Sequence, residues 1–132
     1  MLCKSNRLVK RRDFEALSRS GRPIHSQSIT IRFQPNHSSA LRIGIAVSLK
    51  VSKRATVRNL IRRRIREVFR RHLPSIQGGY NIAVYVKPAA IGRSYKLLAV
   101  EIGSLLNRAK ILRSSWVDIL GKQSKSIQST SV

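Results

Sequence analysis

The segment from Lys50 to His72 most constrains the fold of this chain, because it combines dense positive charge with an apolar repeat at helical spacing. At about 100° per residue, its apolar side chains share one stripe of a helix predicted over about residues 56–73, which Pro74 ends. The stripe consists of Val57, Ile61, Ile65, Val68 and Phe69. A helix with one apolar stripe is stabilised by packing that stripe on another element. The sequence therefore predicts a folded core beneath this helix.

The rest of the predicted helix is covered by arginine. The segment contains ten basic residues and one acid, Glu67, and six arginines lie outside the stripe: Arg62, Arg63, Arg64, Arg66, Arg70 and Arg71. Lys50, Lys53 and Arg54 extend the charge into the preceding loop. Solvated helix faces usually mix both signs of charge, and this one does not. Guanidinium groups bind phosphate oxygens in a bidentate way and stack on bases, so the surface indicates nucleic acid, with simple solvation as the alternative.

Composition supports one small basic domain. The chain has 132 residues, 27 of them Lys or Arg and 5 Asp or Glu, for a formal charge of +22, and 42% of its residues are apolar. That is enough for a single core, which we expect within residues 1–120. Residues 121–132 are rich in Ser and Gln and are expected to form a disordered basic tail. The charge favours a polyanionic partner, with nucleic acid ahead of an anionic membrane surface.

Several function classes are disfavoured by what the sequence lacks. Cys3 is the only cysteine, which fits a reducing cytoplasm and leaves no partner for a disulfide or a zinc cluster. No apolar run is long enough for a signal peptide or a membrane span. The five acids are scattered and the three histidines are far apart, so no catalytic or metal-ligating group is visible. We expect a cytoplasmic protein without a metal site or catalytic residues of its own.

The remaining pattern predicts an α+β fold. Residues 27–34 and 41–49 alternate between apolar and polar or small side chains, and we predict that they pair as an antiparallel hairpin. A third strand is expected over residues 80–87, a short helix around 13–17, and a last helix over about 94–112. The order α-β-β-α-β-α predicts a two-layer sandwich, in which helices pack on a small, mostly antiparallel sheet.

The basic segment has a specific order of residues: Val47 to Lys50, Lys53 to Ala55, Arg58-Asn59, Ile61 to Arg63, and Arg66 to Phe69. Further matches follow in order outside it: Asn6 to Leu8, Asp13-Phe14, Gly21, Arg42 to Gly44, Tyr80 to Ile82, and Lys87 to Ala89. Over about residues 6–112 the chain thereby resembles the protein subunit of bacterial ribonuclease P. Leu60 departs from the resemblance, since the family commonly has an arginine there.

The resemblance implies a ribonucleoprotein endonuclease that removes the 5′ leader from precursor tRNA. Its RNA subunit would hold the catalytic magnesium ions, and the protein would increase substrate affinity and lower the demand for magnesium. In the family the arginine-rich helix faces the catalytic RNA, which implies that role for Arg58, Asn59, Arg62, Arg63 and Arg66; the charge pattern adds Lys50, Lys53, Arg54 and Arg70. Asn59 has an alternative interpretation as a residue at the helix N-terminus. Arg58 borders the apolar stripe, so its stem is expected to pack while its guanidinium reaches outward.

The family also binds the single-stranded leader in a cleft between the N-terminal helix and one sheet face. The matching positions are Phe14, Thr30, Arg32, Ala46 and Ser48. Gly44, Ala46 and Ser48 are small and would leave room for a nucleotide chain, Arg32 would hold phosphate, and Phe14 would stack on a base. Core packing is the alternative role for Phe14. The family fold includes a left-handed crossover between parallel strands, against the usual right-handed rule.

One other class of function remains open. A structural RNA-binding protein of the ribosomal type would share the size, charge and fold class. A protein that binds DNA or a membrane surface is disfavoured, because the sequence shows neither a helix-turn-helix pair nor a bulky apolar face opposite the basic one.

Overall fold

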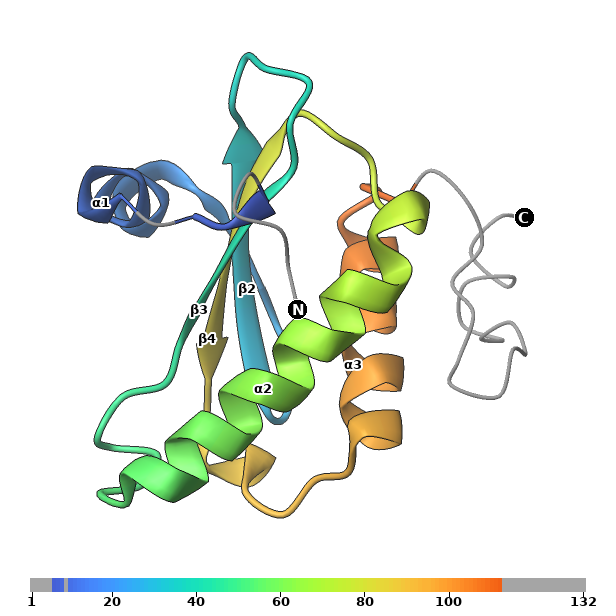
Figure 1. Cartoon of the computed structure of the whole chain (residues 1–132). Coiled ribbons are helices and arrows are strands. Elements are labelled where there is room, and N and C mark those ends of the chain that lie inside the picture. Colours follow the sequence, from blue (N-terminus) through green and yellow to red (C-terminus); the bar gives the residue numbers. More distant parts are fainter. Residues whose placement is uncertain (1–5, 9, 113–132) are drawn as a thin grey trace.

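The computed structural model describes residues 6–8 and 10–112, which form three helices and a four-stranded sheet (Figure 1). The elements follow in the order α1 (Arg11–Ser20), β1 (Arg22–His25), β2 (Ile29–Pro35), β3 (Arg42–Ala46), α2 (Ala55–His72), β4 (Tyr80–Val86) and α3 (Tyr95–Arg108). Short 3-10 turns follow α2 at Leu73–Ser75 and β4 at Pro88–Ala90. The predicted α+β class is confirmed, whereas the predicted tail lies outside the described residues.

The sheet has the strand order β1-β2-β4-β3, and this order makes the predicted hairpin wrong. β2 pairs antiparallel with β1 and β4, while β3 pairs parallel with β4, so β4 separates the two strands expected to be neighbours. The reason lies in β4, where Ile82, Ala83 and Val84 are all fully buried. A strand buried on both faces is typical of the sheet interior, and the long connection through α2 allows β4 to occupy that place.

One strand and one strand boundary also differ from the prediction. β1 is an additional strand before α2, so the predicted order α-β-β-α-β-α lacks one strand. Its four residues include Pro23 and are too few to form a recognisable alternation, and all four are exposed or half-buried. β3 ends at Ala46, although the alternation was expected to continue to Leu49. Ser48 and Leu49 lie in the following turn, where the Ser48 carbonyl accepts from the Val51 amide at 3.0 Å, and Leu49 is 66% exposed. An alternation of apolar and polar residues does not by itself show where a strand stops pairing with its neighbour.

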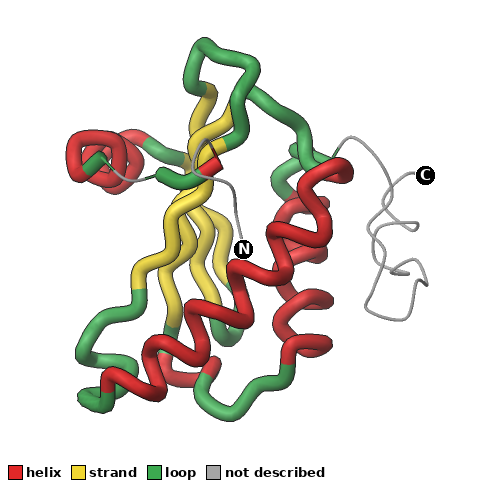
Figure 2. The backbone as a smooth tube through the Cα atoms, in the orientation of Figure 1, coloured by secondary structure: helices red, strands yellow, loops and turns green. Residues whose placement is uncertain are grey.

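The helices cover both faces of the sheet. Figures 1 and 2 show α2 and α3 on one side and α1 on the other. The predicted stripe of α2 faces the larger core, with Ile61, Ile65, Val68 and Phe69 buried and Val57 packed at its margin. A second, small cluster lies beneath α1 and contains Leu8, Leu17 and Ala83, with Phe14 and Tyr85 partly buried against it. α1 therefore packs on the face of the sheet opposite α2 and α3.

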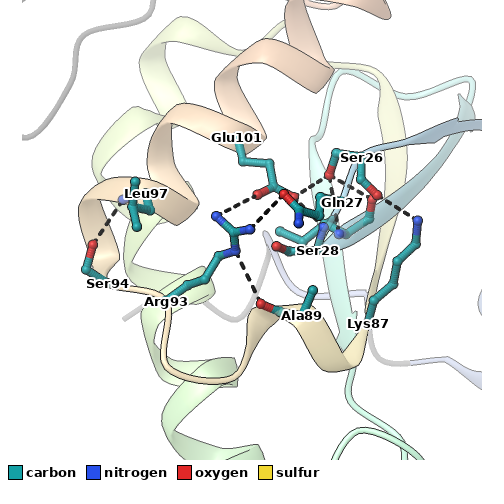
Figure 3. A network of polar contacts seen from close by, with 10 residues as sticks. Ser26, Gln27, Ser28, Lys87, Ala89, Arg93, Ser94, Leu97 and Glu101 are labelled. Carbon is teal, nitrogen blue, oxygen red and sulfur yellow. Dashed lines mark hydrogen bonds and ion pairs between the residues drawn. The ribbon is translucent and has the colours of Figure 1, made fainter.

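A polar network joins α3 to the turn between β1 and β2 (Figure 3). The Glu101 carboxylate accepts hydrogen bonds from the Ser28 amide at 2.8 Å and from the Ser26 hydroxyl. The Arg93 guanidinium lies 4.0 Å from the other Glu101 oxygen, and the Lys87 ammonium donates to the Ser26 carbonyl at 2.6 Å. These contacts hold the turn between β1 and β2 against α3 and the end of β4. They thereby fix the end of β1 and the start of β2.

Among the helices of residues 6–8 and 10–112, none has an apolar stretch long enough to span a membrane.

Candidate nucleic-acid interface

The outer face of α2 presents a basic hollow. It is lined by Asn59, Arg62, Arg63, Arg66 and Glu67, and has a volume of about 540 Å³. Asn59 is the fifth residue of the helix, so it does not cap the N-terminus; its Oδ1 accepts a 2.6 Å hydrogen bond from Arg62 Nη1. The structure thus brings together four of the residues that the resemblance assigns to the catalytic RNA.

Other arginines of α2 are engaged within the protein. Arg64 donates to the Arg93 carbonyl at 2.7 Å, and the Arg71 guanidinium lies 5.4 Å from the centre of the Tyr95 ring. Both contacts attach α2 to α3 and its preceding loop. Arg58 is half-buried, and its Nη1 donates to the Ser52 carbonyl at 2.9 Å, so its guanidinium turns toward the loop before the helix. Arg58, Arg64 and Arg71 are therefore less available to bind RNA than the other arginines of α2.

The loop before α2 adds three exposed basic residues, Lys50, Lys53 and Arg54. Its backbone is fixed by serine side chains, because Ser48 Oγ accepts from the Lys50 amide at 3.2 Å and Ser52 Oγ from the Arg54 amide at 3.1 Å. Together with the Arg58 contact, these bonds hold the loop against the first turn of α2. The positive surface consequently continues from the hollow toward the N-terminus of the helix.

Glu67 is the one acid on α2, and it forms ion pairs with two neighbours. Its carboxylate accepts from Arg70 at 2.6 and 2.8 Å and from Arg71 at 3.0 Å. These hydrogen bonds, from Arg70 first, lower the pKa of Glu67 to about 2. The carboxylate therefore stays charged at every pH at which RNA would bind, and it orders two guanidinium groups at the C-terminal end of the helix.

We predict that Glu67→Gln slightly lowers the free energy of unfolding at pH 7. The pKa of Glu67 is lower in the folded protein, about 2, than its ordinary value of 4.5, so its contribution is complete above about pH 4.5. The difference between wild type and variant should shrink as the pH falls from about 4.5 to about 2. Urea unfolding of both proteins across this range measures it, and a difference that stays constant would contradict the ion pairs.

Three of the predicted leader-binding positions, Thr30, Arg32 and Ala46, lie in neighbouring cross-strand rows on the opposite face of the sheet. In one row Thr30 of β2 lies opposite Tyr85 of β4, which in turn lies opposite Ala46 of β3. Thr30 also lies opposite His25 of β1, and the two side chains are hydrogen-bonded at 3.0 Å. Tyr85 is thus placed between two predicted residues, although it was not predicted as a site residue itself. Its position beside Ala83 on the non-core face was the signal that could have identified it.

The next row contains Arg32, Ala83 and Gly44, and here the expected open space is filled. A Cβ atom at residue 44 would lie 2.1 Å from Cζ of Phe14, so the aromatic ring rests on the glycine. Phe14 therefore packs directly on Gly44. Its ring occupies the space that was expected to admit a nucleotide. Phe14 is half-buried and also packs against the cluster beneath α1, so packing accounts for part of its surface only.

The two remaining cleft residues differ from expectation in their surroundings. Arg32 is half-buried, and its Nη1 donates to the Gly21 carbonyl at 3.1 Å, directly after α1. One of its donors thus attaches the end of α1 to the sheet, and the others remain for phosphate. Ser48 lies beyond the last residue of β3, in the turn toward α2, so it does not share the strand face with Ala46.

Within residues 6–8 and 10–112 there is no group of three or more His, Cys, Asp or Glu placed to hold a metal ion.

Comparison with known proteins gives a consistent result. The family described as Ribonuclease P matches residues 2–110. A ribonuclease P protein component from Cyanothece sp. is 38% identical over 128 residues, covering 85% of this chain and 98% of that protein. The Staphylococcus aureus RNase P protein has a TM-score of 0.75 at 27% identity, covering 83% of this chain and all of that one. For the Thermotoga maritima RNase P protein the values are 0.71 and 29%, with 77% and 96% covered.

Proposed function

The chain belongs to the ribonuclease P protein family, and we propose that it is the protein subunit that assists removal of the 5′ leader from precursor tRNA. In this proposal the outer face of α2 binds the catalytic RNA. The cleft between α1 and the sheet binds the single-stranded leader. Both RNA partners would be met in the cytoplasm.

The observation that carries this proposal is the presence of two different surfaces on one domain. The α2 face presents Arg62, Arg63 and Arg66 with Asn59, which suits a folded RNA whose phosphates approach from several directions. The sheet face presents Phe14 and Tyr85 among small residues, which suits unstacked bases of a single strand. A structural RNA-binding protein would need the first surface and has no use for the second.

The chain's own contribution to catalysis would be binding and positioning. In the described residues Glu15, Glu67 and Glu101 are each engaged with arginines. From membership of the ribonuclease P protein family we infer that the RNA subunit holds the magnesium ions and performs the cleavage. The protein would screen phosphate repulsion between the two RNAs and fix the leader, so less magnesium would be needed for screening.

Leader removal at low magnesium tests the proposed function. Purified protein is mixed with a bacterial ribonuclease P RNA and a precursor tRNA, and release of the 5′ leader is followed over time. We expect strong stimulation over the RNA alone, with the gain decreasing as magnesium is raised. Absence of any stimulation at low magnesium would overturn the proposal.

We predict that Tyr85→Ala weakens precursor tRNA binding by the holoenzyme about fivefold, near the lower end of the 1–3 kcal/mol of a base–aromatic stack, since the ring is partly buried. Tyr85→Phe retains the ring and should bind nearly as well as wild type. Mature tRNA, which has no leader, is the control substrate. Equal losses for both substrates would show that Tyr85 serves packing and not the leader.

A further inference from the structure

The N-terminal segment holds Arg7 beside the outer edge of the sheet. Asn6 Nδ2 donates to the Leu41 carbonyl at 2.8 Å, and the Leu8 amide donates to the Ile43 carbonyl at 2.9 Å. Arg7 forms a parallel bridge with Ile43 between these contacts, and Leu8 is buried at 4% exposure. The backbone of Arg7 is therefore fixed along β3.

A pocket of about 190 Å³ lies between this segment, β3 and α2. Its lining consists of Arg7, Leu8, Phe14, Ile43, Gly44, Ile45 and Arg66. Phe14, resting on Gly44, provides an apolar wall, and among the described residues of the lining the charged side chains are the guanidinium groups of Arg7 and Arg66. Sites for whole small molecules usually have about 300–1,000 Å³, so this pocket suits a smaller group.

The two guanidinium groups lack a carboxylate partner in the described part of the chain. The ion pairs found there join Arg11 to Glu15, Arg93 to Glu101, and both Arg70 and Arg71 to Glu67. The pKa of Arg66 is lowered, first by burial and then by the charges of Arg62 and Arg7. Arg66 is half-buried and Arg7 is exposed, so two positive charges meet at this pocket, where an anion would relieve their repulsion.

Arg66 also connects this pocket to the hollow on α2, because it lines both. Phe14, on the other side of the pocket, belongs to the leader cleft. A nucleic-acid backbone that crosses the outer face of α2 could therefore reach the cleft without leaving positive surface. The pocket occupies the junction between the two surfaces of the proposed function.

We propose that this pocket binds a single phosphodiester group of RNA, gripped by Arg7 and Arg66 together. The inference rests on the proposed function and adds a site for one phosphate at the junction of its two surfaces. Each guanidinium donates to a non-bridging oxygen, and Phe14 packs on the adjoining sugar or base. The phosphate belongs either to the leader of precursor tRNA or to the catalytic RNA, and the two sources are separated by experiment.

The first test uses the free protein and inorganic phosphate as the probe. Wild type, Arg7→Gln, Arg66→Gln and the control Arg19→Gln, which removes an exposed charge on α1, are melted over a phosphate titration at constant ionic strength. An anion that binds the folded state raises the Tm. We expect the phosphate-dependent rise to be reduced in both pocket variants and retained in Arg19→Gln. Equal rises in all four proteins would overturn the site.

The second test identifies the source of the phosphate in the holoenzyme. If it comes from the leader, Arg7→Gln should lose about tenfold in precursor tRNA affinity, as expected for one charge-assisted contact, with mature tRNA and catalytic RNA binding unchanged. Arg66→Gln should lose affinity for both RNAs, because Arg66 also lines the hollow on α2. If it comes from the catalytic RNA, assembly affinity should fall by a similar factor instead. The Arg7→Gln/Arg66→Gln double variant should lose clearly less than the product of the single losses, because both groups act on one phosphate.

The failures of the two proposals are distinguishable. Wild-type protein that does not stimulate leader removal contradicts the proposed function. Wild-type protein that stimulates, with pocket variants that match Arg19→Gln in both affinities, contradicts the pocket alone. Fully multiplicative losses in the double variant would likewise overturn it, since Arg7 and Arg66 would then bind separate groups.

Discussion

Replacing Arg62 and Arg63 together with alanine is expected to weaken binding of the catalytic RNA about a hundredfold. Both residues line the hollow on α2, and Arg63 is exposed while Arg62 is bonded to Asn59 only. A hydrogen bond to a charged group contributes about 1.5 kcal/mol or more, so two lost contacts amount to about 3 kcal/mol. The fold should be retained, because neither side chain belongs to the core.

The salt dependence of RNA binding gives a second, quantitative measure of the lost phosphate contacts. Each phosphate contact contributes about 0.7–0.9 to the slope of log affinity against log salt concentration, so the double variant should have a slope smaller by about 1.4–1.8. Filter binding or fluorescence anisotropy with labelled RNA at several salt concentrations measures both quantities. Lys96→Ala combined with Lys110→Asn removes two exposed charges near the ends of α3 and is the matched control. An unchanged slope, or an equal effect of the control, would place the interface elsewhere.

Gly44→Ala is expected to weaken precursor tRNA binding at least tenfold while leaving catalytic RNA binding nearly intact. The new methyl group would lie 2.1 Å from Cζ of Phe14, so the ring has to leave its place on β3. Loss of one base–aromatic stack costs about 1–3 kcal/mol. A single methyl group on a strand would thus have an effect comparable to that of removing the aromatic ring itself.

The double variant Phe14→Ala/Gly44→Ala separates this mechanism from general damage to the sheet. With the ring absent, the added methyl group no longer clashes with Phe14, so the double variant should bind precursor tRNA as well as Phe14→Ala alone. Binding is measured with precursor and mature tRNA, and thermal unfolding reports the integrity of the fold. Additive losses in the double variant, or losses shared by mature tRNA, would show that Gly44 is needed for the strand and not for Phe14.

Local features of the fold were predictable, because they depend on neighbours along the chain. The stripe of α2 follows from the spacing of Ile61, Ile65 and Phe69, and the structure buries these residues as expected. Strand pairing depends on segments that are distant in the sequence. The alternation in residues 27–34 and 41–49 predicts two strands but does not show which strands pair with them. The hairpin prediction failed for this reason, since β4 follows only after α2 and then inserts between them.

The candidate site also combines features that depend on neighbours along the chain with features that depend on distant segments. The residues of the α2 hollow share one helix, so their common face could be worked out from sequence. The row of Thr30, Tyr85 and Ala46 comes from three strands, and its register appears only once β4 is in place. The pocket at Arg7 depends on a short segment that pairs with β3 over a single bridge, which no periodicity reveals. What the resemblance contributed was the assignment of roles, and those roles stay predictions for the experiments above.

The connection between β3 and β4 restricts how a chain of this kind can vary. α2 joins these two parallel, adjacent strands, so the helix is also the crossover connection between them. Deleting one residue within it would rotate all later side chains by about 100° and shorten the helix by about 1.5 Å. The arginines would turn toward the core while β4 slid against its neighbours. Substitutions on α2 can therefore tune RNA binding one residue at a time, whereas changes in its length would disrupt the RNA-facing surface and the leader cleft together.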